Sequence, residues 1–197
     1  TQVENLFFSI EDFEVDKRKP LGRGAWAKVF IAERSSDHQP FAAKIYIDGK
    51  ASDQKMIMMA ALAQQKLEHP AILKFHGISF CSFENSSRFE PTILLAYMPN
   101  GTLRSILDKE KNGLADAKWT PTKKYINLLG IAHAMKCMHE HGIIHRDIKP
   151  ENVLLDENYY PQVSGFSLCC MFDHPLKISM EMEMATGIGT PIYMAPE

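Results

Sequence analysis

The sequence predicts an α+β fold in two parts, an antiparallel sheet of five strands with one helix, followed by a mostly helical region. Short runs rich in β-branched and aromatic residues, bounded by turn residues, dominate the first half of the chain. The turn Met-Pro-Asn-Gly at 98–101 separates them from a long segment with helical periodicity. With 197 residues and 45% hydrophobic content, the chain can bury a core.

The sheet region follows an amphipathic lead-in at residues 1–12. Strands are expected in five segments that polar turns separate: near Phe13, at 28–33, at 41–46, at 73–79 and at 92–97. A helix over about 53–67 is expected between the third and fourth strands, with Ser52 as its N-cap and Pro70 as its stop.

The second region contains one strongly marked helix. Thr120 and Pro121 combine an N-cap residue with a proline at the first helical position, and Gly142 is placed for a left-handed C-cap. Apolar residues recur between them at helical spacing: Tyr125, Leu128, Leu129, Ala132, Met135 and Met138. We expect this stripe to pack in the core and to hold the loop that follows the helix.

The composition favours a soluble protein of the cytoplasm. A formal charge of -2 gives no reason to expect nucleic acid or an anionic membrane as the main partner. No apolar run approaches the roughly 20 residues of a membrane span, and the N-terminus lacks a signal-peptide pattern. The four cysteines show no Cys-x-x-Cys spacing, so we expect reduced thiols.

The stretch His-Arg-Asp-Ile-Lys-Pro-Glu-Asn at 145–152 has the residue types that phosphoryl transfer requires. Asp147 supplies a carboxylate that can orient a hydroxyl, and Lys149 an ammonium that can neutralise phosphate. Asn152 supplies an amide oxygen that can ligate magnesium. These three residues are therefore the candidate catalytic residues.

Four motifs in this order resemble those of the eukaryotic protein-kinase superfamily, nearest to its serine/threonine and tyrosine-kinase-like branches. They are Leu-Gly-Arg-Gly at 21–24, Phe-Ala-Ala-Lys at 41–44, the stretch 145–152, and Gly-Thr-Pro-Ile-Tyr-Met-Ala-Pro-Glu at 189–197. The lysine two residues after Asp147 is similar to that of the serine/threonine kinases. The resemblance implies a two-lobed fold with an N-lobe at 13–98 and a C-lobe at 99–197. This C-lobe is incomplete, because the family has further helices after the Ala-Pro-Glu motif.

The resemblance also implies an ATP-type nucleotide site. Its residues would be Leu21, Gly22, Gly24, Val29, Ala42, Lys44, Ala96, Met98 and Leu154, with Leu95 as gatekeeper. Asn152 would be the metal ligand, and Thr190 would lie near Asp147. Ser179 and Thr186 are candidate phosphorylation sites, with Arg146 as the partner of the phosphate.

Three departures from the family pattern argue against efficient catalysis. Ala27 stands where a third glycine is usual in the glycine-rich loop. Ala60 stands where the helix of the family carries the glutamate that pairs with Lys44. Gly165 replaces the metal-binding aspartate, so magnesium is expected to bind weakly or not at all. Removing one electrostatic group from such a site costs on the order of 10²–10³ in rate.

Three interpretations remain open from the sequence. The first is a kinase-like domain of serine/threonine type with impaired catalysis, a pseudokinase that acts by binding or allostery. The second is an active serine/threonine kinase that transfers the ATP γ-phosphate to protein hydroxyls with another group holding magnesium. The third is a non-functional kinase fragment in which the helix from Tyr125 leaves an apolar face open. The first two imply a protein partner or substrate.

Overall fold

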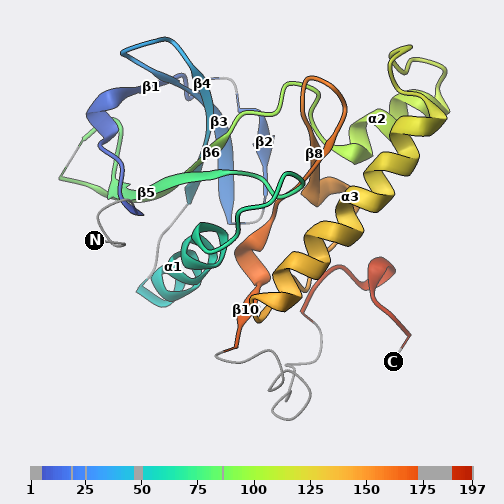
Figure 1. Ribbon diagram of the computed structural model, residues 1–197. Helices are drawn as coiled ribbons and strands as arrows, with labels where there is room; N and C mark the ends of the chain where they lie inside the picture. The colour runs from blue at the N-terminus through green and yellow to red at the C-terminus, as the bar shows by residue number, and fades with distance from the viewer. Residues whose placement is uncertain are drawn as a thin grey trace. The chain divides into compact units, whose positions relative to one another are not determined.

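The computed structural model describes residues 6–18, 20–24, 26–46, 51–85, 87–172 and 188–196, with the side chains of 51–53 excepted. The chain divides into two compact units. The first unit comprises residues 1–61 and 74–97, and the second comprises residues 62–73 and 98–197. Figure 1 shows the sheet strands early in the chain and the longest helix, α3, in the second half.

The first unit is built on an antiparallel sheet with the strand order β1-β3-β4-β6-β5. The strands are β1 (Phe13–Val15), β3 (Ala27–Arg34), β4 (Pro40–Tyr46), β5 (Phe75–Cys81) and β6 (Phe89–Ala96). The predicted five-stranded antiparallel sheet is confirmed, and the short strand β2 (Gly22–Arg23) pairs in addition with β3.

The bounds of two strands differ from the prediction. β5 begins at Phe75 instead of residue 73, and β6 begins at Phe89 instead of Thr92. Pro91 made the earlier start of β6 hard to predict, because proline cannot donate a hydrogen bond to a neighbouring strand. In the structure Pro91 falls where the β5–β6 register shifts between Ser79 and Cys81, and a register shift tolerates the missing donor.

The helix of the first half, α1, spans Ala51–Gln65. The prediction that Ser52 is its N-cap is wrong, because the helix already includes Ala51. The helix also ends before the predicted stop at Pro70. Alanine, serine and aspartate are all tolerated in a first helical turn, so the sequence 51–53 does not fix the first residue.

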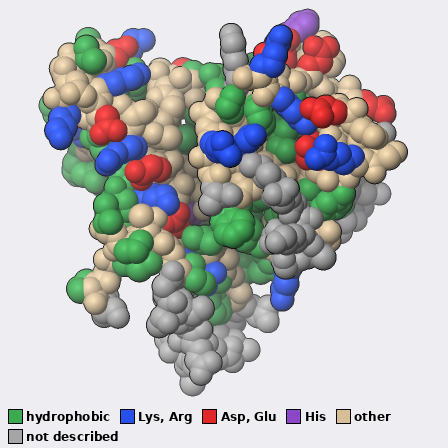
Figure 2. Space-filling model, turned by 180° about the vertical axis from the view of Figure 1, so that it is seen from behind, with side chains coloured by type: hydrophobic (Ala, Val, Ile, Leu, Met, Phe, Trp, Pro, Cys, Tyr) green, Lys and Arg blue, Asp and Glu red, His purple; other side chains and the backbone are tan. Residues whose placement is uncertain are grey.

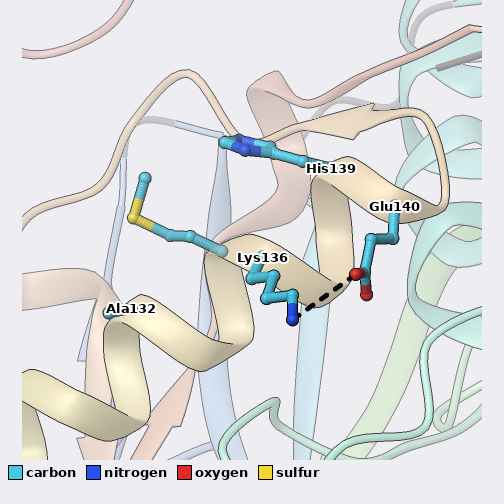
Figure 3. A pocket seen from close by; sticks show the side chains of 5 residues that line it. Ala132, Lys136, His139 and Glu140 are labelled. Carbon is cyan, nitrogen blue, oxygen red and sulfur yellow. Dashed lines mark ion pairs between the residues drawn. The ribbon is translucent and has the colours of Figure 1, made fainter.

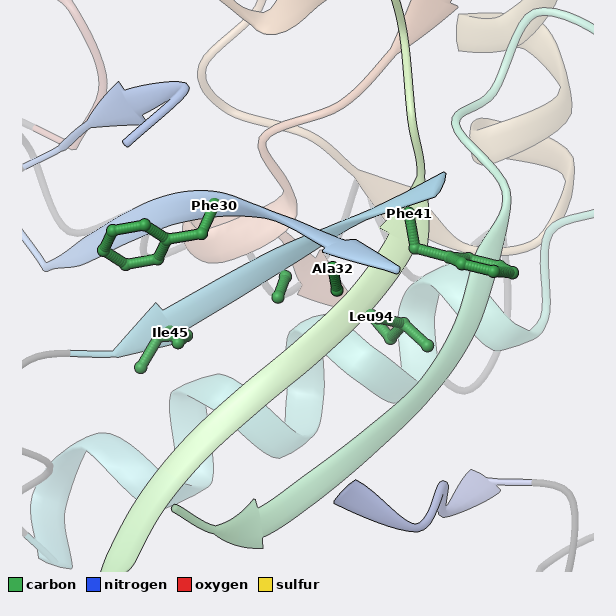
Figure 4. Close-up of a cluster of buried hydrophobic side chains, with 6 residues drawn as sticks. Phe30, Ala32, Phe41, Ile45 and Leu94 are labelled. Atoms are coloured by element: carbon green, nitrogen blue, oxygen red, sulfur yellow. The ribbon is translucent and has the colours of Figure 1, made fainter. Parts of the chain in front are cut away.

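The core of the first unit lies on one face of the sheet, as Figure 4 shows. Its buried members are Phe30, Ala32, Phe41, Ala43, Ile45 and Leu94. Phe8 and Phe13 from the chain's beginning pack against this cluster. The rings of Phe8 and Phe13 meet edge to face at 5.5 Å, and those of Phe13 and Phe41 at 5.4 Å. The segment before β1 therefore covers the sheet as part of the first unit.

Among its described residues, the second unit contains the end of α1, the helices α2 and α3, and short paired strands around the loop at 145–149. Its elements are α2 (Leu103–Lys111), α3 (Pro121–Glu140), β7 (Ile143–Ile144), β8 (Val153–Leu155), β9 (Pro161–Val163) and β10 (Cys170–Met171). Strand β7 pairs with β10, and β8 pairs with β9. The 3-10 helices are η2 (Ile10–Asp12) in the first unit, and η3 (Pro150–Asn152), η4 (Phe166–Leu168) and η6 (Pro191–Tyr193) in the second. The sequence analysis did not anticipate α2 or these short strands.

The predicted ends of α3 are confirmed. Thr120 is the N-cap, and its hydroxyl accepts a hydrogen bond of 3.3 Å from the backbone N–H of Lys123. Pro121 occupies the first turn, and Gly142 follows the helix with φ of 68°. This left-handed conformation is the one for which glycine is favoured.

The predicted apolar stripe of α3 lies mostly outside the core. Tyr125 and Leu128 are 63% and 68% exposed, and Leu129 and Ala132 are also exposed. The prediction that these four residues pack in the core is therefore wrong.

The buried face of α3 consists of Asn127, Ala134 and Met138. These residues are seven and four positions apart, so they lie on one side of the helix. Asn127 Nδ2 donates a hydrogen bond of 2.9 Å to the carbonyl oxygen of Tyr159, which compensates the burial of a polar side chain. Helical periodicity identified an apolar stripe that includes Met138, but it could not tell that the buried face lies to one side of the stripe, around Asn127 and Ala134.

Two further observations concern the surface. On the face shown in Figure 2, positive and negative side chains are interspersed among the described residues. None of the helices in the described ranges combines the length and the apolarity needed to cross a membrane.

Candidate active site

A buried histidine holds the loop that follows β7. His145 is 2% exposed, and its Nε2 lies 2.7 Å from the carbonyl oxygen of Ser164. The backbone N–H of Asp147 donates to His145 Nδ1 at 3.2 Å. A carbonyl oxygen only accepts and an amide N–H only donates, so the proton of this neutral imidazole is on Nε2. The ring also meets Phe166 at 5.1 Å, and these contacts fix the backbone of Asp147.

Arg146 adopts a left-handed conformation, with φ of 63°. This conformation is uncommon for a residue other than glycine. Its guanidinium Nε donates a hydrogen bond of 2.6 Å to the carbonyl oxygen of Leu168, which ties the loop to η4. The proposed phosphate acceptors Ser179 and Thr186 lie outside the described residues.

Asp147 is the centre of a hydrogen-bond network. The Thr190 hydroxyl donates to Asp147 Oδ1 at 2.6 Å, which confirms the expectation that Thr190 lies near Asp147. Lys149 Nζ lies 2.8 Å from Asp147 Oδ2 and donates to Thr190 Oγ1 at 2.7 Å. Asn152 Nδ2 donates to the Asp147 carbonyl oxygen at 2.7 Å and to its Oδ2 at 2.8 Å. The structure thus brings together all three predicted catalytic residues.

This network sets the charge state of Asp147. Burial by itself would raise the pKa of the carboxyl group, but the hydrogen bonds from Lys149, Thr190 and Asn152 outweigh burial and lower its pKa. Asp147 is therefore an anion at neutral pH. A carboxylate with a lowered pKa is a weak proton acceptor, so Asp147 is better suited to orient a hydroxyl group than to take its proton.

Gly165 directly precedes η4 and has φ of 87°, in the left-handed region. A Cβ atom at this position would lie 2.5 Å from Cγ and 2.6 Å from Oδ1 of Asn152. The backbone of Asn152 is also fixed, since Ser164 N and Oγ donate to its carbonyl oxygen at 2.8 Å and 3.0 Å. The side-chain amide of Asn152 therefore fills the space that a side chain at position 165 would need.

The oxygen atoms around this loop are a poor fit to a magnesium ion. Magnesium prefers an octahedron of oxygen ligands, usually including one or two carboxylates. Both carboxylate oxygens of Asp147 already accept hydrogen bonds, and Asn152 has one side-chain oxygen to offer. Within the described ranges no three histidine, cysteine, aspartate or glutamate side chains form a group that could hold a metal ion.

The glycine-rich segment forms a hairpin in the first unit. The backbone N–H of Leu21 donates to the Val29 carbonyl oxygen at 2.7 Å, and that of Gly24 donates to the Ala27 carbonyl oxygen at 2.8 Å. A Cβ atom at Gly22 would meet nothing within 4 Å. Ala27, at the place of the usual third glycine, is buried. The hairpin therefore tolerates alanine at the third position.

Lys44 lies in β4, directly opposite Val29 of β3 and Ile93 of β6. Ala42 and Lys44 are two residues apart in the strand, so both side chains lie on the same sheet face as Val29. This is the arrangement that the predicted nucleotide slot requires. The role of these residues stays a prediction.

The remaining predicted nucleotide-binding residues divide between the two units. In the first unit Leu21 is 46% exposed, and the backbone N–H of Ala96 donates to the Lys74 carbonyl oxygen at 3.0 Å. In the second unit the Met98 carbonyl oxygen accepts a bond of 3.3 Å from Gly101, and Leu154 lies half-buried in β8.

Sequence reasoning missed one residue and one steric overlap. The missed residue is Tyr46, whose ring centre lies 5.2 Å from Lys44 Nζ in the same strand. Asn152 was identified, but the overlap of its amide with the Cβ position of residue 165 was not. The i, i+2 spacing of Lys44 and Tyr46 was a usable signal, whereas the overlap depends on how the loop folds.

A surface pocket on α3 takes no part in this arrangement. Figure 3 shows its lining by Ala132, Met135, Lys136, His139 and Glu140. The ammonium of Lys136 lies 3.7 Å from the carboxylate of Glu140, and both side chains are mostly exposed. None of these residues was predicted to act in catalysis or binding.

Comparison with known proteins gives one consistent result. The family described as protein kinase domain matches residues 15–197. A probable LRR receptor-like serine/threonine-protein kinase of Arabidopsis thaliana is 30% identical over 190 residues, which is 95% of this chain and 17% of that protein. CBL-interacting serine/threonine-protein kinase 3 of Arabidopsis thaliana is 31% identical over 182 residues, 91% of this chain and 38% of that protein. The serine/threonine-protein kinase greatwall of Xenopus tropicalis is 28% identical over 189 residues, 96% of this chain and 19% of that protein.

The chain therefore spans less than two fifths of the length of each of these relatives. The bonds of Thr190 with Asp147 and Lys149 bring the motifs at 145–152 and 189–197 together. The family match extends from β1 to the last residue of the chain. This chain belongs to the protein kinase domain family.

Proposed function

We propose that this serine/threonine-type kinase-like domain binds an ATP-type nucleotide, transfers phosphate poorly or not at all, and acts by binding a protein partner or by allostery. Membership of the family implies ATP binding. The observation that carries the impairment is the position of the Asn152 amide, whose Cγ lies 2.5 Å from the place that a Cβ atom at residue 165 would take. This position supports a site that has no room for the aspartate from which the family would hold a metal.

The physical reason lies in the charge of the reaction. Phosphoryl transfer needs the negative charge of the phosphates to be neutralised, and metal ions normally supply most of that neutralisation. When bound, magnesium would bridge phosphate oxygens, but the loop has little to hold it with. Lys44 and Lys149 remain as cationic side chains that can bind phosphate. Binding of the nucleotide is therefore expected to persist while the rate of transfer falls.

An active serine/threonine kinase is the second candidate, and one observation favours it. The network of Asp147, Lys149 and Thr190 is complete. Asp147 would orient the hydroxyl of a protein substrate, and Lys149 would stabilise the transferred phosphoryl group. This function requires a magnesium ligand in addition to Asn152.

We also propose the cytoplasm as the location of the domain. All four cysteines are free thiols. Free thiols are typical of reducing compartments, whereas extracellular domains commonly pair their cysteines.

The decisive experiment is thermal unfolding of the 197-residue chain with increasing ATP, once with excess magnesium and once with EDTA. A ligand at one hundred times its Kd stabilises the folded state by about 2.7 kcal/mol, so binding is easily seen. We expect similar stabilisation with and without the metal. Transfer of radiolabelled γ-phosphate to serine and threonine peptides is measured in parallel, and we expect no transfer above background.

The outcomes separate the candidates. Tighter binding with magnesium, together with transfer that Asp147→Asn abolishes, would establish the active kinase and refute our proposal. No stabilisation by ATP under either condition would refute nucleotide binding.

A further inference from the structure

An aromatic ring accompanies the phosphate-binding lysine of the first unit. Tyr46 follows Lys44 by two positions in β4, so both side chains project from the same face of the sheet. Lys44 Nζ lies over the ring, 5.2 Å from its centre. This distance is within the limit of about 6 Å for attraction between a cation and an aromatic face.

The ring of Tyr46 is held in place by its surroundings. The residue is 4% exposed, and its backbone pairs with Ala27 of the glycine-rich hairpin. Its hydroxyl has no hydrogen-bond partner among the residues that the structure describes. The ring face, and not the hydroxyl, therefore makes the contact with Lys44.

The family pattern pairs this lysine with a carboxylate. In that pattern a glutamate of the helix pairs with the lysine, but here the position is Ala60, which is 2% exposed. The sequence of α1 contains one acidic residue, Asp53, in its first turn. Mid-helix, α1 therefore cannot supply a carboxylate to Lys44.

We propose that Tyr46 is a positioning residue, which orients the ammonium group of Lys44 by cation–π contact. The inference rests on the proposed function, because an oriented lysine matters only where a nucleotide phosphate binds. The contact fixes the direction in which the ammonium group points, so we expect it to favour binding of a phosphate at Lys44.

The contact itself is tested without any nucleotide. Lysine side chains of the 197-residue chain are labelled by reductive ¹³C-methylation, and the Lys44 signal is assigned as the one that Lys44→Arg removes. Methyl groups over the face of an aromatic ring resonate upfield, so we expect an upfield Lys44 signal in the wild type. We also expect a nuclear Overhauser effect between these methyl groups and the Tyr46 ring protons.

Two substitutions separate the ring from the hydroxyl. Tyr46→Phe keeps the ring and removes the unsatisfied hydroxyl, so the Lys44 signal stays upfield. Tyr46→Leu removes the ring, so the signal moves to the position of an exposed lysine. Metal-free ATP should bind about three- to tenfold more weakly to Tyr46→Leu than to the wild type. Its affinity for Tyr46→Phe should equal its affinity for the wild type.

Failure of the inference and failure of the proposed function are distinguishable. A Lys44 signal that lacks both the upfield shift and the Overhauser effect in the wild type overturns the inference, whatever the nucleotide does. An upfield signal in a chain that ATP does not stabilise would support the contact and refute the proposed function. If Tyr46→Leu does not fold, the Overhauser effect in the wild type tests the inference by itself: its presence supports the contact between Lys44 and Tyr46, and its absence refutes the contact.

Discussion

Gly165→Ala is expected to destabilise the domain strongly, although it adds a single methyl group. Two costs add at this position. A residue other than glycine in the left-handed region costs about 1–2 kcal/mol. The new Cβ would also lie 2.5 Å from Asn152 Cγ, and overpacking of this kind costs about 1–3 kcal/mol. The sum, about 2–5 kcal/mol, is a large part of a typical domain stability of about 5–15 kcal/mol.

The same overlap predicts that Gly165→Asp does not restore metal-dependent transfer by itself. The aspartate tolerates the left-handed backbone better than alanine, but its Cβ meets the same amide. Removing that amide with Asn152→Ala deletes Cγ and both terminal atoms. In a double-mutant cycle with Gly165→Ala, the second substitution should therefore recover about 1–3 kcal/mol.

The measurement is urea unfolding of the wild type, the two single variants and the double variant, followed by circular dichroism. Gly113→Ala is a matched control, because Gly113 has φ of 69° but a Cβ there would meet nothing within 4 Å. It reports the backbone cost alone. If Gly165→Ala costs no more than Gly113→Ala, or if the cycle shows no coupling, the amide does not fill this space and the reasoning is refuted.

Three further predictions test other parts of the structure. The pKa of Asp147 is lowered, so its contribution to stability is present above the unfolded value of 3.8 and is lost as pH falls below it. Asp147→Asn should therefore lose less stability than the wild type between pH 5 and pH 3 in urea titrations, and equal losses would contradict this. Met138→Ala should lower the free energy of unfolding by about 2–5 kcal/mol, whereas Leu128→Ala should change it by about 0.5 kcal/mol or less. If urea unfolding gave the reverse order, the other face of α3 would be the buried one. Phe8→Ala should lower the free energy of unfolding by about 1–3 kcal/mol, because the Phe8 ring packs on the sheet. Phe7→Ala is the control and should lower it clearly less, because Phe7 is 49% exposed. Equal shifts of the melting temperature would show that the segment before β1 is not part of the core.

Much of the fold could be predicted because local signals and the family pattern agree. The strands of the first unit have β-branched and aromatic runs between turns, and α3 has an N-cap, a proline and a C-terminal glycine. The place of Thr190 beside Asp147 followed from the family resemblance, whereas the ion pair of Asp147 with Lys149 was not predicted.

The failures have a common physical origin. The stripe of α3 was predicted to be buried as a whole, but periodicity could not show that Met138 lies inside with Asn127 while Leu128 lies outside. That choice is made by what packs on the helix, including the Tyr159 carbonyl oxygen that accepts a hydrogen bond from Asn127. The overlap of the Asn152 amide with the Cβ position of residue 165 likewise depends on tertiary structure, since thirteen positions separate the two residues in the sequence.

The two departures that matter most change the charge in the same direction. Ala60 and Gly165 each stand where the family pattern has a carboxylate, so the chain has two negative charges fewer at these positions. Two missing negative charges have the same effect on the net charge as one added magnesium ion. Under the proposed function, fewer carboxylates would repel a bound phosphate less, while the loss at position 165 also removes a ligand of the ion that aligns and activates the γ-phosphate. We therefore expect the two substitutions to favour retention of the ligand over transfer of its phosphate.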